Sequence, residues 1–109
     1  IPRGEGDEAT VEFFKLGKFV SDDNLAIEYQ KRGLDPADPY TLVAVNEADP
    51  AFADKYPNIT HWQDKNGNWC YIAFYRYVGG RYVGVGRDAY DWGGLWWFGG
   101  VRKSRTLGN

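Results

Sequence analysis

Residues 69–101 constrain the fold most, because aromatic and β-branched residues fill this stretch and glycines interrupt it at short intervals. Such residues favour extended strands, and Gly79-Gly80 and the longer segment 86–94 are typical of the turns between strands. An Asn-Gly pair just before this stretch marks one more turn. Consecutive hairpins form an antiparallel meander, so we expect about four strands over residues 59–102.

The N-terminal half carries a strand signal and then a helix signal. Segment 10–16 is apolar and rich in residues that favour strands, which predicts a short strand. Ser21 is a favourable N-cap, acidic residues follow it, and Gly33 suits the end of a helix. These signals predict a helix over about 22–32.

Two Asp-Pro pairs follow, and each is typical of an N-cap with proline at the first helical position. After Asp38-Pro39, the apolar spacing over 39–48 favours a helix, whereas the β-branched residues there leave a strand open. After Asp49-Pro50 we expect a short helix from Ala51 to about Lys55.

Together these segments predict one α+β domain of 109 residues, in which N-terminal helices pack as a second layer on one face of the meander. The N-terminal strand is expected to extend the sheet. The expected divisions are a flexible lead-in (1–8), a strand segment (9–20), a mainly helical segment (21–56), the meander (59–102) and a tail (103–109).

The predicted sheet has two unlike faces, because side chains alternate along a strand. In strand 69–77 one face carries Cys70, Ile72, Phe74 and Arg76, and the other carries Trp69, Tyr71, Ala73, Tyr75 and Tyr77. We expect helices to cover the first face. The aromatic face is then either a platform for a partner or ligand, or it is sealed by the N-terminal segment and the loop 88–93. The candidate binding residues are Trp69, Tyr71, Tyr75, Tyr77, Tyr82, Trp96, Arg76 and Arg81.

Few residues offer catalytic or metal chemistry. Cys70 is the only cysteine and His61 the only histidine, which excludes an intramolecular disulfide and a His-pair metal site. His61 and Cys70 lie on consecutive predicted strands, so an enzyme using His61 is one alternative, although Cys70 falls on the face expected to be buried. Asp88 and Asp91 share a loop but lack the further spaced oxygen ligands of a calcium loop. We therefore assign no catalytic residue, no metal site and no cofactor.

Localisation signals are sparse. No apolar run approaches the length of a membrane span, so no membrane partner is expected. A single cysteine is compatible with a reducing compartment, which favours the cytoplasm. Asn58-Ile59-Thr60 matches a glycosylation acceptor, a motif that arises often by chance.

The net charge of −2 hides an asymmetry between the two halves. Residues 1–58 carry six Lys and Arg against twelve Asp and Glu, and residues 59–109 carry seven against three. Such a split indicates either a partner-facing surface or two halves that pack against each other. The acidic residues expected on the helical layer are Asp22, Asp23, Glu28, Asp35, Asp38, Glu47, Asp49 and Asp54.

These patterns favour a small non-catalytic binding or inhibitory module that contacts another protein, or a second copy of itself, through the aromatic face or the acidic layer. A small accessory protein of a bacterium or bacteriophage matches this description. The alternative is carbohydrate or single-stranded nucleic-acid binding on the aromatic face, because arginines lie among its tyrosines. The acidic net charge disfavours nucleic acid.

Overall fold

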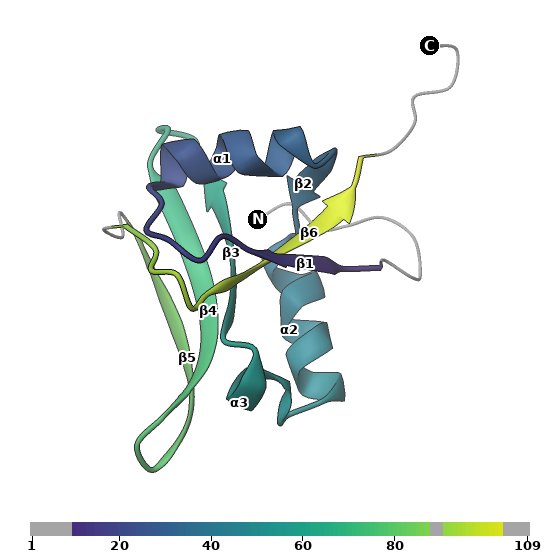
Figure 1. Cartoon of the computed structure of the whole chain (residues 1–109), viewed down its shortest axis with the longest axis vertical. Helices are drawn as coiled ribbons and strands as arrows, with labels where there is room; N and C mark the ends of the chain where they lie inside the picture. The colour runs from purple at the N-terminus through teal and green to yellow at the C-terminus, as the bar shows by residue number, and fades with distance from the viewer. Residues whose placement is uncertain (1–9, 88–90, 104–109) are drawn as a thin grey trace.

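The computed structural model describes residues 10–87 and 91–103 as an α+β domain with three helices and six strands (Figure 1). The helices are α1 (Asp22–Lys31), α2 (Pro39–Ala48) and α3 (Phe52–Lys55). The strands are β1 (Glu12–Lys15), β2 (Leu34–Pro36), β3 (Asn58–Gln63), β4 (Trp69–Tyr77), β5 (Gly80–Arg87) and β6 (Trp97–Arg102). None of the described helices is both long and apolar enough to cross a membrane.

The local signals for the helices are confirmed. Ser21 caps α1, and its hydroxyl accepts a hydrogen bond from the backbone N–H of Asn24. Asp38 caps α2 in the same way, and proline at the first helical position fixes the backbone there. Segment 39–48 is therefore helix, and the strand alternative for it is wrong. The short helix after Asp49-Pro50 and the strand within 10–16 are also present.

The sheet has the order β1-β6-β3-β4-β5, and β2 pairs with β6 as well. All pairs are antiparallel except β3 with β6. The expected meander therefore holds for β3, β4 and β5 but not for β6, which lies on the far side of β3. Trp92, in the connection before β6, forms a bridge with Val20, so the chain crosses one face of the sheet instead of returning beside β5.

The helices lie on both faces of the sheet, which differs from the expected single helical layer. α1 packs Leu25 and Tyr29 against Ile59 and Phe98 on one face. α2 and α3 cover the opposite face, where the second core cluster holds Leu42, Ala53, Ile72 and Phe74. Both faces of β3 are consequently buried at residues 58–61. Sequence patterns did not show this division because each helix has its own apolar stripe, and either face of the sheet satisfies such a stripe.

Two adjacent glycines let helices approach both faces of β6. A Cβ on Gly99 would lie 3.0 Å from a methyl carbon of Leu42 in α2, and a Cβ on Gly100 would lie 3.0 Å from the Tyr29 ring in α1. The Tyr29 hydroxyl donates a 2.7 Å hydrogen bond to the carbonyl of Gly99. Glycine at both positions thus allows β6 to lie at the centre of the core.

Ion pairs join the acidic N-terminal half to the basic C-terminal half. The Arg102 guanidinium binds Glu12 at 2.7 Å, and Lys103 lies 3.6 Å from Asp35. Arg81 binds Asp54 at 2.8 Å. These contacts support the interpretation that the charge asymmetry reflects the packing of the two halves.

Candidate functional site

The β4–β5 hairpin is the most exposed apolar part of the described structure. Val78 and Gly79 form its two-residue turn, where Gly79 has a φ of 86° that favours glycine. Pairing then runs without a break from Tyr77 with Gly80 to Cys70 with Arg87. The tyrosine and the valines of β5 favour this long ladder, whereas the glycines between them weaken it.

Both core clusters end at β4, and no residue of β5 belongs to either of them among the described residues. The apolar side chains of the hairpin are therefore left in solvent. We call this set the hairpin surface: Tyr77 (68% exposed), Val78 (83%), Tyr82 (44%), Val83 (58%) and Val85 (69%). Tyr77 and Tyr82 lie on one face of the hairpin, and Val83 and Val85 lie on the other. Groups of exposed apolar residues usually mark an interaction site.

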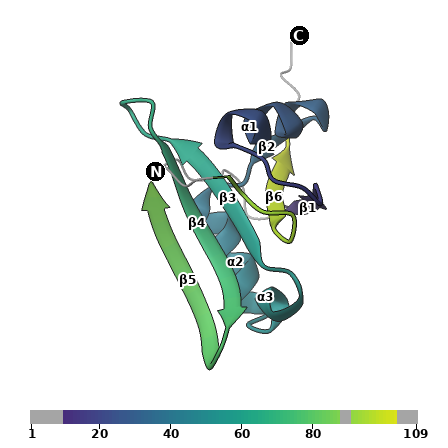
Figure 2. The ribbon, with the colours of Figure 1, turned by 60° about the vertical axis from the view of Figure 1, so that its left-hand side comes forward.

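β5 is also an edge strand. It is the last strand in the sheet order, and no described residue pairs with its outer side. Figure 2 shows β5 along one flank of the molecule, with β4 between it and the rest of the sheet. An edge of this length without proline or lysine presents a row of unpaired backbone N–H and C=O groups, which is a template for another strand.

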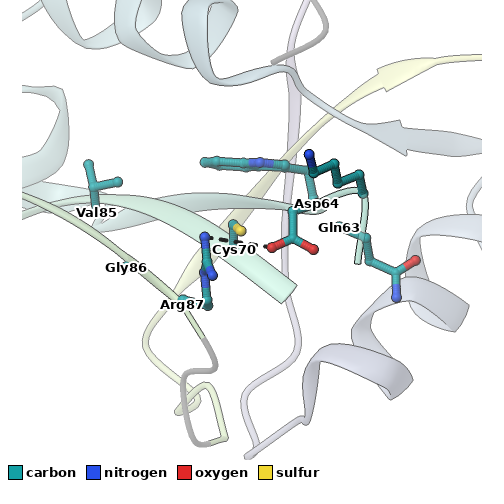
Figure 3. Close-up of a pocket in the computed structure, with 8 residues that line it drawn as sticks. Gln63, Asp64, Cys70, Val85, Gly86 and Arg87 are labelled. Atoms are coloured by element: carbon teal, nitrogen blue, oxygen red, sulfur yellow. Dashed lines mark ion pairs between the residues drawn. The ribbon is translucent and has the colours of Figure 1, made fainter. Parts of the chain in front are cut away.

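A hollow of about 650 Å³ lies on the α2 face beside the end of β5. Its floor includes Cys70 and Val85, and its rim includes Gln63, Asp64 and Arg87 (Figure 3). The Arg87 guanidinium lies 3.6 Å from the Asp64 carboxylate across the hollow. Apolar floor and charged rim are thus both available to a side chain from a neighbouring molecule.

A smaller hollow of about 210 Å³ separates the other end of β5 from α2 and α3. Pro50, Ala53, Phe74 and Val83 contribute its apolar lining. The two hollows lie on the same face of β5, because Val83 and Val85 are two residues apart and point to the same side.

Charges at this site are held in place by ion pairs and backbone hydrogen bonds. The hydrogen bond from Arg81 lowers the pKa of Asp54 below its usual value, and Arg76 at 3.4 Å adds to the effect. The pKa of Asp64 is lowered chiefly by the backbone N–H of Asn68. Both carboxylates therefore stay ionised and offset part of the positive charge of Arg76, Arg81 and Arg87 on the α2 face.

The structure brings most of the predicted aromatic residues together but covers several of them. Trp69 stacks on His61 with ring centroids 4.2 Å apart, and its indole N–H donates to Asp23. Tyr71 packs edge-on against Trp92 at 5.0 Å. These residues lie under α1 and the segment that carries Trp92, so the sealed arrangement describes this part of the face better than an open platform.

The outer part of the aromatic face remains accessible. Tyr75 stacks on Tyr82 at 5.7 Å and meets Trp96 edge-on at 5.9 Å, and all three are partly exposed. Trp96 precedes β6 instead of lying in it. Arg76 and Arg81 pair with each other in register and lie on the α2 face, opposite the tyrosines. Stacking groups and positive charges are therefore on different faces.

His61 and Cys70 do not meet. Cys70 is opposite Trp62 in the β3–β4 register, whereas His61 is opposite Tyr71, so the two side chains lie on opposite faces of the sheet. The alternative in which they meet across the hairpin is wrong because the register is offset by one residue. His61 is fully buried, and its Nδ1–H donates to the Asp22 carboxylate at 2.8 Å.

The structure also bears on the glycosylation triplet at Asn58 and on possible metal sites. Asn58 is fully buried and exchanges hydrogen bonds with Asn46, which makes it inaccessible as a glycosylation acceptor in the folded chain. Asp88 lies outside the described residues, so the loop it shares with Asp91 is not placed. Over residues 10–87 and 91–103, no group of three His, Cys, Asp or Glu side chains is arranged to hold a metal ion.

Sequence reasoning missed the outer edge of β5 and the burial of Asp22, which accepts hydrogen bonds from both His61 and the Trp92 indole N–H. The open edge of β5 could have been predicted from the sequence. The segment Arg81 to Arg87 reads Arg-Tyr-Val-Gly-Val-Gly-Arg, which is almost the same in both directions and contains no residue that protects an edge by breaking a strand. The burial of Asp22 could not be predicted in this way, because its partners are 39 and 70 residues away along the chain.

Comparison with protein-family models, with curated proteins and with solved structures found no match to this chain. Function is accordingly inferred from the geometry of the site.

Proposed function

We propose that this chain is a non-catalytic protein-binding module that holds its partner through the hairpin surface and the outer edge of β5. The observation that carries the proposal is an eight-residue edge strand, open on its outer side among the described residues, with exposed tyrosine and valine side chains beside it. An added strand gains main-chain hydrogen bonds from the edge, and side-chain hollows provide specificity.

The two hollows support this mode of binding. They lie on the α2 face near Val83 and Val85, where alternate side chains of an added strand would point. Tyrosines on the opposite face supply large contact areas with little loss of conformational entropy, as at many protein interfaces.

The acidic layer gives weaker support. Its members are divided between the two faces of the sheet, and several already serve the chain's own structure. Asp22 is buried, Asp38 caps α2, and Asp54 binds Arg76 and Arg81.

The alternatives have fewer observations in their favour. Single-stranded nucleic acid is bound where aromatic and basic side chains share one groove, whereas here Tyr82 and Arg81 point to opposite faces. The full burial of His61 leaves it out of reach of a substrate in this conformation.

Site-specific photocrosslinking in an extract of the source cells tests the proposal. A photoreactive amino acid at Val83 should form adducts with a protein chain. The matched control places it at Ile27, an exposed apolar residue of α1 that is 53% exposed and far from β5 in sequence and fold. Adducts at neither position, or equal adducts at both, would contradict a binding role for the hairpin.

A further inference from the structure

We propose that the partner of the β5 edge is a second copy of this chain, paired antiparallel to β5 about a twofold axis at Gly84. This inference rests on the proposed function and names the occupant of the same site. It follows from the hydrogen-bonding geometry of β5, from its nearly palindromic sequence, and from the position of its charges.

Hydrogen-bonding geometry decides which backbone groups are free. The pair that flanks a two-residue turn, here Tyr77 and Gly80, is hydrogen-bonded, and hydrogen-bonded pairs alternate along an antiparallel ladder. Residues 80, 82, 84 and 86 therefore direct their N–H and C=O groups toward β4. The outward groups belong to Arg81, Val83, Val85 and Arg87.

The sequence of β5 is complementary to itself in the register centred on Gly84. Val83 then lies opposite Val85 of the second copy, and Gly84 lies opposite itself. In this register each outward residue meets an outward residue, as an antiparallel ladder requires. It pairs the seven residues from Arg81 to Arg87. A centre on Val83 would also pair seven residues, but it would place Arg81 opposite Val85 instead of valine opposite valine.

Side chains on both faces also match in this register. Val83 and Val85 of the two copies form one apolar strip on the α2 face, which covers side chains that are 58% and 69% exposed in the single chain. On the other face Tyr82 lies opposite Gly86 of the second copy, and the Tyr71 ring of that copy already lies above this glycine. The two tyrosine rings would then be neighbours across the contact. A twofold contact of this kind is self-complementary and closes at two copies.

The ends of the paired segment bring Arg81 opposite Arg87 of the second copy. Two bare cations there would repel each other. Each arginine already binds a carboxylate of its own chain, because Arg81 contacts Asp54 and Arg87 lies near Asp64. These carboxylates reduce the repulsion between the two arginines, although Asp54 is shared with Arg76 at 3.4 Å. No other described element lies at this flank of the sheet (Figure 2).

The first test is the mass of the purified chain by sedimentation. We expect twice the single-chain mass of 12.4 kDa, in a concentration-dependent manner. Val83→Pro removes an outward N–H without removing a hydrogen bond to β4, so it should give a folded monomer. Val83→Thr keeps the N–H and the shape, and should remain a dimer. Circular dichroism verifies that both variants fold.

The second test fixes the register. Opposed residues of a non-hydrogen-bonded pair have Cα atoms about 4.5 Å apart, within the range that a disulfide spans. Gly84→Cys should therefore form a disulfide-linked dimer on mild oxidation, and a Cβ there meets only an ordinary contact with Tyr75 at 3.7 Å. Val78→Cys, at the exposed turn, is the control and should stay uncrosslinked, as should the native chain, whose Cys70 is buried.

A native chain that stays monomeric up to about 1 mM, where even −4 kcal/mol of binding free energy gives association, overturns the proposal. A dimer that survives Val83→Pro, or that leaves Gly84→Cys unlinked, overturns it too. The proposed function has its own test. It predicts adducts from Val83 in the extract, whether the protein chain in those adducts is a second copy or a different protein.

Discussion

Asp22 lies in the first turn of α1, where acidic residues are usually exposed, but its side chain is buried. Its carboxylate oxygen accepts hydrogen bonds from His61 at 2.8 Å and from the Trp92 indole at 2.9 Å. The carboxylate only accepts, so the proton of a neutral His61 lies on Nδ1, and the buried Nε2 has no partner among the described residues. The residue thus links α1 to β3 and to the segment before β6.

Replacing Asp22 with alanine leaves two buried donors without an acceptor, and we expect it to lower the free energy of unfolding by about 1–3 kcal/mol. Asp23→Ala is the matched control in the same first turn of α1. It loses only the exposed hydrogen bond from Trp69 and should cost about 0.5–1 kcal/mol. Urea unfolding followed by tryptophan fluorescence measures both, and equal losses would contradict the role assigned to Asp22.

Tyr29 gives the structure a pH dependence in the alkaline range. Its burial raises the pKa of its hydroxyl well above the usual 10.0, and the nearby charge of Asp22 adds to this. The folded chain keeps the proton after the unfolded chain has begun to lose it near pH 10. Stability therefore falls as pH rises above about 10, by up to about 1.4 kcal/mol per pH unit, and Tyr29 contributes no pH dependence below that value.

Free energies of unfolding measured from about pH 8 to about pH 11 test this in the native chain and in Tyr29→Phe. The variant loses the hydrogen bond to Gly99 and is less stable throughout. Its stability should nevertheless fall less steeply above about pH 10. The same slope in both proteins would show that Tyr29 ionises without unfolding.

At the scale of elements, the seal over the inner aromatic face depends on two loop segments that meet closely. Val20 and Trp92 form reciprocal backbone hydrogen bonds of 2.9 and 2.7 Å. Gly94 lies so near the neighbouring loop that an added Cβ would be 2.7 Å from the backbone carbon of Gly17. Backbone cannot move aside as a flexible side chain can, so glycine is required at this crossing.

Gly94→Ala should therefore separate the two segments and lower the free energy of unfolding by about 1–3 kcal/mol. Gly80→Ala is the control, because an added Cβ there meets nothing within 4 Å; we expect a change within about 0.5 kcal/mol. Thermal melts by circular dichroism compare the two, and quenching of tryptophan fluorescence should rise only in the first variant. Unchanged stability in Gly94→Ala would indicate that the loops separate freely.

Features that depend on neighbouring residues could be predicted from the sequence, whereas the packing of segments far apart in the chain could not. Ser21 and Asp38 predict the starts of their helices, because an N-cap hydrogen bond joins residues that are three apart. Period-two alternation placed Tyr71 and Ile72 on opposite faces correctly. The position of β6 beside β3, and of α1 opposite α2, depends on contacts across dozens of residues, which no local pattern encodes. The short strand β2 was missed because three residues carry no periodicity.

On the scale of the whole molecule, Phe98 lies where three strands join. It is fully buried, is paired with Phe14 in β1 and Ile59 in β3, and contacts the core under α1. The two core clusters pack on the same strand, because Ala73 of β4 belongs to one and Ile72 and Phe74 belong to the other. We therefore expect the chain to unfold as one cooperative unit.

Phe98→Ala should lower the free energy of unfolding by about 3–5 kcal/mol. Far- and near-ultraviolet circular dichroism should still report one common transition. The control is Phe19→Ala, which truncates a phenylalanine that is 74% exposed and should change stability by about 0.5 kcal/mol or less. Separate transitions for the two signals in Phe98→Ala would indicate that parts of the chain fold independently.

The central place of β6 has a consequence for synthesis on the ribosome. β1 and β2 pair only with this strand among the described elements, and β3 needs it on one side. While residues 97–102 are still inside the ribosome and β5 has already left it, the helices and the β3–β5 hairpins can form, but the first strands have nowhere to bind. The sheet closes only after residue 102 leaves the exit tunnel, so translation sets the earliest moment at which the domain is complete.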